Sequence, residues 1–170
     1  KLSSVTYFNQ REYGHDKIVN YTMTDFSGFI NGIVKPSLGD EAAVNQMPFS
    51  AIGREQLRAV IRGNPGKLRD QAARKVLRYL RRTAYPTFLN EQFGTTDSQV
   101  LHMLRMISAD DWGMGTDTLS ALEAFQSGAP GLDDDYLATL LGRRAAAQDD
   151  GGEPYIHHFP DGNASIARLL

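Results

Sequence analysis

The sequence predicts an α+β fold that is mainly helical, with a few short strands. Apolar residues recur at intervals of three and four along most of residues 54–142, which is typical of helices that bury one face. Two short aromatic and β-branched runs, 4–9 and 155–159, lie outside this stretch. The 170 residues, 41% hydrophobic and 22% charged, suffice for one packed domain. No apolar run approaches the roughly 20 residues that span a bilayer.

We divide the chain into a lead-in over 1–50, a helical core over 51–144, and a last part over 145–170. In the lead-in, residues 4–9 predict a short edge strand and Tyr13-Gly14 predicts a turn. Phe26, Phe29, Ile30 and Ile33 stand at helical spacing. We therefore expect a helix over 21–34 and a loop over 36–50.

The first half of the core predicts three helices. Leu57, Val60 and Ile61 share one face of a helix over 54–62, which Gly63 ends. Apolar residues four apart predict one continuous helix over 67–82. A short helix follows Pro86 and ends at Phe93-Gly94.

The second half of the core predicts three more helices. The first, over 97–107, has three residues that could cap its N-terminus: Thr95, Thr96 and Asp97. The second is capped by Thr116, buries Phe125 and ends at Gly128. The third covers 134–142.

The last part predicts a polar linker over 145–153 and then a strand–turn–helix unit. The strand covers 154–159, Pro160–Asn163 turns, and a helix opens at about Asn163. Free N–H groups at such a helix start can face an anion or a polar ligand. An ordinary strand-to-helix connection has the same kinds of residue. This pattern alone therefore does not distinguish a ligand-binding turn from a simple connection.

Charge is segregated along the chain, although the net charge is only −2. Residues 54–82 hold ten basic and two acidic residues, a net charge of +8. Residues 109–135 hold seven acidic residues and no basic one. The simplest interpretation is that these faces meet each other or lie in solvent. The nearly neutral total and the absence of a recognised binding motif do not favour nucleic acid as a partner.

Three other patterns are weak as functional signals. Gly113-Met114-Gly115 resembles the start of a phosphate loop, but it follows a predicted helix, so a helix-to-helix turn is favoured. His157 and His158 are adjacent on a predicted strand and point to opposite faces, which does not suit one metal ion. The chain has no cysteine, which excludes disulfides, thiolate zinc sites and cysteine nucleophiles.

The two ends of the sequence suggest a piece of a longer protein. The first residue is Lys1, and no signal segment precedes it. The last residues, Leu169-Leu170, are apolar and stop within the predicted helix that follows the turn. We therefore expect the chain to be an internal segment.

Three segments of the sequence resemble bacterial spermidine dehydrogenase-like flavoproteins of the flavin amine oxidase superfamily. The most specific is His158 to Leu170, HFPDGNASIARLL. Within it, Pro160–Asn163 is similar to a Pro-x-Gly-Gly turn that opens a helix of the family's substrate domain, with Asn163 in place of the second glycine. The other two are Tyr7-Phe8-Asn9 with Tyr13-Gly14 and Asp16-Lys17, and Gly113-Met114-Gly115 followed by Leu119–Leu122.

The resemblance implies that the chain is the substrate-binding or cap region of a larger FAD-binding α/β flavoprotein. That protein would oxidise a polyamine such as spermidine by hydride transfer to FAD and pass electrons to an acceptor. Family members often carry a twin-arginine export signal, which implies a periplasmic or membrane-associated location, with a cytoplasmic one still open. The glycine fingerprint for FAD and the flavin-contacting segment are absent from this sequence. The chain alone is therefore expected to be inactive.

The same resemblance and simple chemistry select candidate site residues. His158 is the catalytic candidate, as a neutral hydrogen-bond partner or base for the amine. Gly162 and Asn163 are candidates for contact with the cofactor. Aromatic faces and carboxylates bind the ammonium groups of a polyamine, and the candidates for this role are Tyr155, Phe159, Trp112, Asp110 and Asp161. Steering of the cation could also involve Asp111 and Asp117.

A second class of function stays open from the residues alone. The basic stretch over 54–82 could make the chain a small helical interaction or nucleic-acid-binding module. A Gly-x-Gly-x-x-Gly turn after a strand in the parent sequence would favour the flavoprotein instead.

Overall fold

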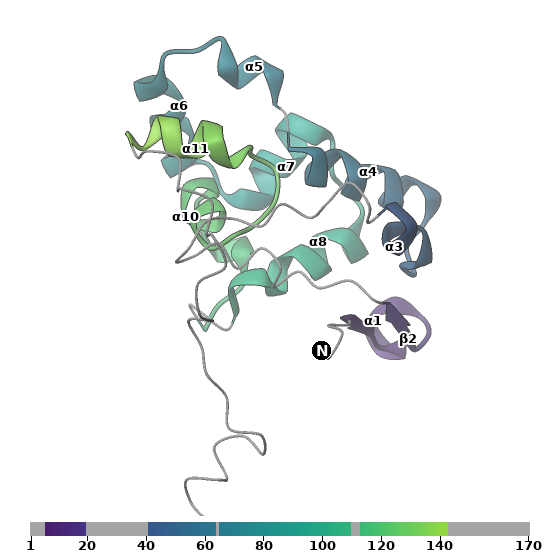
Figure 1. The fold of residues 1–170 in the computed structure, drawn as a ribbon. Helices are drawn as coiled ribbons and strands as arrows, with labels where there is room; N and C mark the ends of the chain where they lie inside the picture. Colours follow the sequence, from purple (N-terminus) through teal and green to yellow (C-terminus); the bar gives the residue numbers. More distant parts are fainter. Residues whose placement is uncertain (1–5, 20–40, 64, 110–112, 143–170) are drawn as a thin grey trace, which may run out of the picture.

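The computed structural model describes residues 6–19, 41–63, 65–109 and 113–142. Within them, helices form the main body and a small two-stranded antiparallel sheet lies beside one end of it (Figure 1). The predicted mainly helical α+β class is confirmed. The predicted helix over 21–34, the strand over 154–159 and the helix after Pro160–Asn163 lie outside the described residues.

The N-terminal unit is a hairpin formed by β1 (Thr6–Phe8), α1 (Gln10–Tyr13) and β2 (Lys17–Val19). β1 pairs antiparallel with β2, and Tyr7 stands opposite Ile18. Gly14 ends α1 with φ 83°, which glycine adopts without steric cost. The strand predicted over 4–9 is confirmed at 6–8, while residues 4 and 5 lie outside the described residues. The turn predicted at Tyr13-Gly14 is found where α1 ends, but α1 itself was not predicted.

Helices α3 (Glu41–Gln46) and α4 (Ala51–Arg62) follow. The loop predicted over 36–50 is wrong for α3, which packs on α4 and buries Val44. α4 begins before the predicted residue 54, because the Ser50 hydroxyl accepts the Gly53 N–H and caps it there. Gly63 ends α4 as predicted, with φ 55°.

The helix predicted over 67–82 is two helices, α5 (Gly66–Arg69) and α6 (Ala73–Arg82). The single helix is wrong because Ala72 is extended, with φ −59° and ψ 134°. On one straight helix Leu68 and Leu80 would lie about 120° apart around the axis. The break lets both side chains reach the core, where they are 4% and 0% exposed.

The next two helices are α7 (Tyr85–Phe93) and α8 (Ser98–Arg105), and the 3-10 helix η3 (Met106–Ser108) continues α8. α7 ends at Gly94 as predicted. Of the three predicted caps for α8, Asp97 is the one used: its carboxylate accepts the N–H groups of Gln99 and Val100 at 3.0 and 3.1 Å.

The last described elements are the 3-10 helix η4 (Thr116–Thr118), α10 (Ala121–Gln126) and α11 (Asp134–Leu140). The predicted cap at Thr116 is wrong, because Ser120 caps α10. Residues 119–121 instead hydrogen-bond with 83–85: Tyr85 N–H donates to the Leu119 carbonyl, and Ala121 N–H donates to the Thr83 carbonyl. This pairing requires extended backbone at 119–120, so no helix can run through it. α11 agrees with the helix predicted over 134–142.

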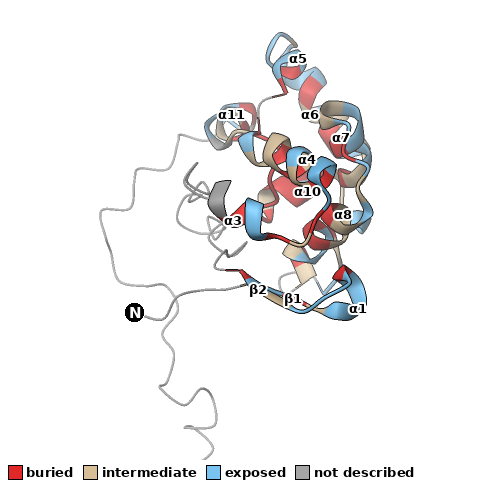
Figure 2. Cartoon of the chain, turned by 90° about the vertical axis from the view of Figure 1, so that its right-hand side faces the viewer, coloured by how far each residue is buried: buried red, intermediate tan, exposed pale blue. Residues whose placement is uncertain are grey.

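The core lies where these helices meet. α6 packs against α10 and α11, while α4 packs against α7 and α8. Phe88 and Phe125 meet edge to face near its centre, with ring centroids 5.0 Å apart. The hairpin lies at one end of this body and α5 at the opposite end, and buried positions line the helices between them (Figure 2).

Candidate functional site

Most of the predicted site residues lie outside the described part of the chain. These are the catalytic candidate, the cofactor candidates and nearly all the polyamine-binding candidates: His158, Gly162, Asn163, Tyr155, Phe159, Trp112, Asp110, Asp111 and Asp161. The structure therefore does not test whether they come together. Asp117 is among the described residues, and it lines a hollow between α7, α8 and η4.

A hollow of about 320 Å³ lies between α7, α8 and η4. Leu89, Leu101 and Pro86 supply apolar wall, and the polar side chains at its edge include His102, Arg105 and Asp117. The Thr116 hydroxyl donates to the Leu104 carbonyl at 3.0 Å and so joins η4 to α8. This hollow can accept an apolar group with a polar end.

Asp117 already has a cationic partner in the hollow. Arg105 Nε lies 3.2 Å from its carboxylate, and both side chains are about half exposed, at 53% and 41%. A pair this exposed contributes little to stability, but it compensates the charge of the carboxylate. Asp117 therefore offers a polyamine less net attraction than the sequence suggests.

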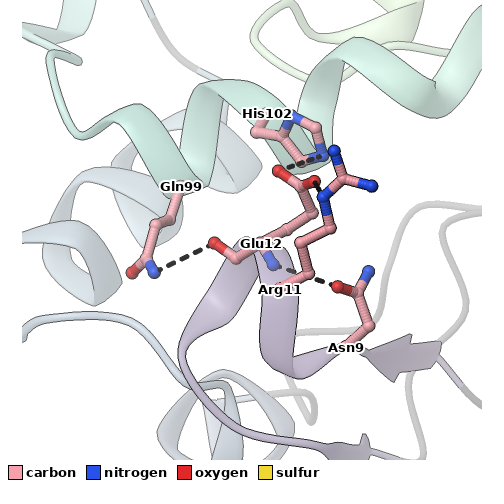
Figure 3. Close-up of polar contacts among 5 residues, drawn as sticks. All are labelled: Asn9, Arg11, Glu12, Gln99 and His102. Atoms are coloured by element: carbon pink, nitrogen blue, oxygen red, sulfur yellow. Dashed lines mark hydrogen bonds and ion pairs between the residues drawn. The ribbon is translucent and has the colours of Figure 1, made fainter.

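His102 connects the helical body to the hairpin. Its Nε2 lies 3.9 Å from a Glu12 carboxylate oxygen (Figure 3). Its ring also packs on the Tyr13 ring, with the two ring centroids 5.8 Å apart. The Gln99 amide donates to the Glu12 carbonyl at 3.5 Å. Burial raises the pKa of Tyr13 to about 12, so its hydroxyl stays neutral. His102 thus joins α8 to the hairpin, although it lies ninety residues after Glu12 in the sequence.

The segment Gly113–Gly115 forms a tight turn between η3 and η4. Gly113 has φ 65°, and the Ser108 hydroxyl donates to the Met114 carbonyl at 2.9 Å. A side chain at Gly115 would meet Asp117 Oδ1 at 2.5 Å and Arg105 Cγ at 2.6 Å. The preference for a helix-to-helix turn over a phosphate loop is confirmed, because Gly115 is packed against side chains rather than open to a ligand.

Most residues of the hairpin pattern make a defined contact within the hairpin. The Tyr7 hydroxyl donates to Asp16 at 2.6 Å, and this bond lowers the pKa of the Asp16 carboxyl. Asn9 caps α1 by accepting the Glu12 N–H. Phe8 packs edge to face on the buried Tyr13 ring at 4.9 Å. These residues therefore shape the hairpin itself.

The basic stretch over 54–82 does not form one face. On α4, the Arg54 guanidinium donates to the carbonyls of Met47 and Phe49, and Arg58 donates to the Asn45 side chain. The arginines of α4 that face α3 are thus engaged with their own chain.

The predicted meeting of basic and acidic faces occurs in part. Arg69 of α5 lies 3.7 Å from Asp133 and over the Tyr136 ring at 5.1 Å. Sequence reasoning missed these pairings because they join residues distant in the chain, and no local pattern marks them.

Comparison with protein-family models and with curated proteins finds no match to this chain. Within the described ranges, no group of three or more His, Asp and Glu side chains could hold a metal ion. No helix in the same ranges has both the length and the apolar character needed to cross a membrane.

Proposed function

We propose that the chain is the substrate-binding or cap portion of an FAD-dependent polyamine dehydrogenase, with spermidine as the expected type of substrate. The observation that carries the proposal is the resemblance of three separate segments to the spermidine dehydrogenase-like flavoproteins. Two of these segments fall among the described residues. Their residues cap a helix, close a hairpin or fill a tight turn.

The chemistry of the reaction assigns tasks to the candidate residues. Flavin accepts the hydride, and the protein positions the C–H bond beside the amine nitrogen and excludes water. The reacting nitrogen must be unprotonated, and His158 is proposed to accept a hydrogen bond or proton from it. Aromatic rings of Tyr155, Phe159 and Trp112 would hold the remaining ammonium groups, together with Asp110 and Asp161.

The described residues do not fit the pyrophosphate of FAD. The one glycine-rich turn that resembles a phosphate loop, Gly113–Gly115, follows a 3-10 helix rather than a strand, and Gly115 is closed off by Arg105 and Asp117. We therefore propose that FAD is held mainly by other parts of the parent protein, with Gly162 and Asn163 as this chain's contribution. The 170-residue chain by itself should bind no FAD.

The partners and location follow as proposals from the same resemblance. The parent protein would be periplasmic or membrane-associated and would pass its electrons to a separate acceptor. The remaining parent polypeptide would complete the site.

The experiment is stopped-flow reduction of the flavin in the complete gene product, with spermidine as substrate and without oxygen. Replacing His158→Phe should slow flavin reduction about 100-fold or more, which is in the range for losing a general base, while FAD remains bound. If His158 only packs, the same variant changes the melting temperature and leaves the reduction rate near wild type.

The acidic candidates have a separate test in the same protein. Asp110→Asn with Asp111→Asn should raise KM more than it lowers kcat, and the effect should shrink with salt, over a Debye length of about 8 Å at physiological ionic strength. An unchanged KM with unchanged salt dependence would assign these two carboxylates to a solvated surface.

A further inference from the structure

Helix α6 presents a strongly basic face that is rigidly held. It carries five basic residues and no acidic one: Arg74, Lys75, Arg78, Arg81 and Arg82. All five are exposed, and at about 100° per residue they fall within one arc of about 120° around the helix. On the opposite side Val76 and Leu80 are fully buried against α10 and α11. Because Val76 and Leu80 fix the opposite face of α6 in the core, the five cationic side chains stay on the solvent side of the helix.

These five cations lack partners among the described residues, whereas other basic residues of the stretch have them. Arg54 and Arg58 are bound to α3 and the segment after it, and Arg69 is paired with Asp133. No ion pair or hydrogen bond joins a side chain of the five to any described residue. Five like charges along about 12 Å of helix repel one another, and a bound polyanion would relieve that repulsion.

We propose that this face of α6 is a docking surface for an acidic segment of a partner protein, which lies along the helix and pairs its carboxylates with the arginines. Four of the five cations are arginine. The guanidinium binds a carboxylate with two parallel hydrogen bonds, which a lysine ammonium cannot do. No α6 residue lines the hollow between α7, α8 and η4, and the proposal does not rest on the proposed enzyme function.

The spacing of the cations suits a narrow partner. Arg74, Arg78 and Arg81 follow one another at four and three residues, or about 6 and 4.5 Å along the axis. A helix laid alongside α6 repeats its own side chains at the same intervals. Acidic residues spaced by three and four would therefore face these arginines together.

Three observations favour an acidic protein segment over a nucleic acid or a lipid surface. The exposed positions of α6 include no aromatic ring for stacking bases, and Tyr79 is partly buried with its hydroxyl on Glu91 at 2.6 Å. No large apolar side chain is exposed on α6 that could enter a membrane interface. Because the neighbouring arginines of α4 and α5 are already engaged, a second basic wall that would make a phosphate-tracking groove is missing from the described structure.

The experiment measures binding of fluorescent probes to the full 170-residue chain by anisotropy, at about 50 and about 300 mM salt. The main probe is a helical peptide of Glu and Ala with Glu at spacings of three and four, and a scrambled peptide of the same composition is its control. A single-stranded oligonucleotide and phosphatidylserine vesicles are the competing probes. The wild-type chain should bind the patterned peptide most tightly, and salt should weaken the complex.

The variants separate a docking face from general attraction. Arg78→Gln with Arg82→Gln should weaken peptide binding about fivefold or more, whereas the control pair Arg11→Gln with Lys17→Gln, which removes the same charge from the hairpin, should leave it within about twofold. Arg78→Lys with Arg82→Lys should also weaken binding, because the paired hydrogen bonds are lost although the charge stays.

Three results would overturn the proposal. The first is that the α6 pair and the hairpin pair lose the same affinity for the patterned peptide. The second is that the lysine variant loses no affinity for it. The third is that the chain binds the oligonucleotide or the vesicles more tightly than the patterned peptide. Melting temperatures of all variants are recorded alongside. The substituted side chains, two on α6 and two in the hairpin, are not part of the core. The melting temperatures of the variants should therefore match that of wild type within a few degrees.

Discussion

Replacing Gly115→Ala tests the tight turn beside the hollow. Gly115 has φ −77° and ψ 158°, a conformation that any residue adopts, so the cost of a side chain there is steric and not conformational. The added Cβ would lie 2.5 Å from Asp117 Oδ1, 2.6 Å from Arg105 Cγ and 3.0 Å from the Arg105 carbonyl. The carboxylate can rotate away, but the first part of the Arg105 stem and its backbone must shift.

The expected cost follows from that shift. Overpacking of this kind reduces the free energy of unfolding by about 1–3 kcal/mol, or a fall in melting temperature of roughly 2–12 °C for a chain of this size. The assay is urea unfolding followed by circular dichroism. Gly113→Asn is the matched control, because no atom lies within 4 Å of its Cβ position and asparagine tolerates its φ of 65°. The control should cost less than about 1 kcal/mol.

A double-mutant cycle identifies the clashing atoms. In an Arg105→Ala background the Cγ atom is gone, so Gly115→Ala should cost at least about 1 kcal/mol less than in wild type. An equal cost in the two backgrounds, or no cost in wild type, would mean that Gly115 is not packed against the Arg105 stem.

Three further predictions concern stability. Tyr85→Phe removes a buried hydroxyl that donates to the Pro130 carbonyl at 2.7 Å, and leaving that carbonyl unpaired should cost about 1–3 kcal/mol in urea unfolding; a cost near zero would mean that water replaces the bond. Asp97→Ala removes the cap of α8 and should cost about 1 kcal/mol, whereas Asn90→Ala on the exposed side of α7 should not. Burial, helped by the bond to Glu91, raises the pKa of Tyr79 to about 12 from 10.0, so the folded state favours its neutral form. Stability from this group is complete below pH 10 and is lost as pH rises from 10 towards 12, so Tyr79→Phe should flatten that decline in melting temperature; parallel curves would contradict it.

Local signals predict helix ends well in this chain. Gly63 and Gly94 end helices where the sequence places them, and Asp97 caps α8, because each acts through its own backbone or nearest N–H groups. The helix break at Ala72 and the cap at Ser120 were not predicted. The break depends on a distant partner, the core that buries Leu68. The cap is local, because the Ser120 hydroxyl accepts the Glu123 N–H, and a serine followed three residues later by glutamate is a sequence signal for it. The backbone pairing of 83–85 with 119–121 excludes a helix that begins at Thr116.

The contacts of the candidate site are predicted less well by the sequence than the helix ends are. The contact of His102 with Glu12 and the pairing of Arg105 with Asp117 arise only when the hairpin, α8 and η4 come together. Periodicity indicates that α8 is a helix, but it does not say which element its polar side meets. The residues selected by the resemblance around His158 stay a prediction.

The most direct test of the proposed function is the absorbance of the complete gene product during mixing with spermidine under anaerobic conditions. We expect the complete gene product to be purified with bound FAD, and spermidine to bleach the absorbance of its oxidised flavin, while the 170-residue chain alone carries no flavin. A complete gene product without flavin, or a bound flavin that spermidine and related polyamines do not reduce, would contradict it.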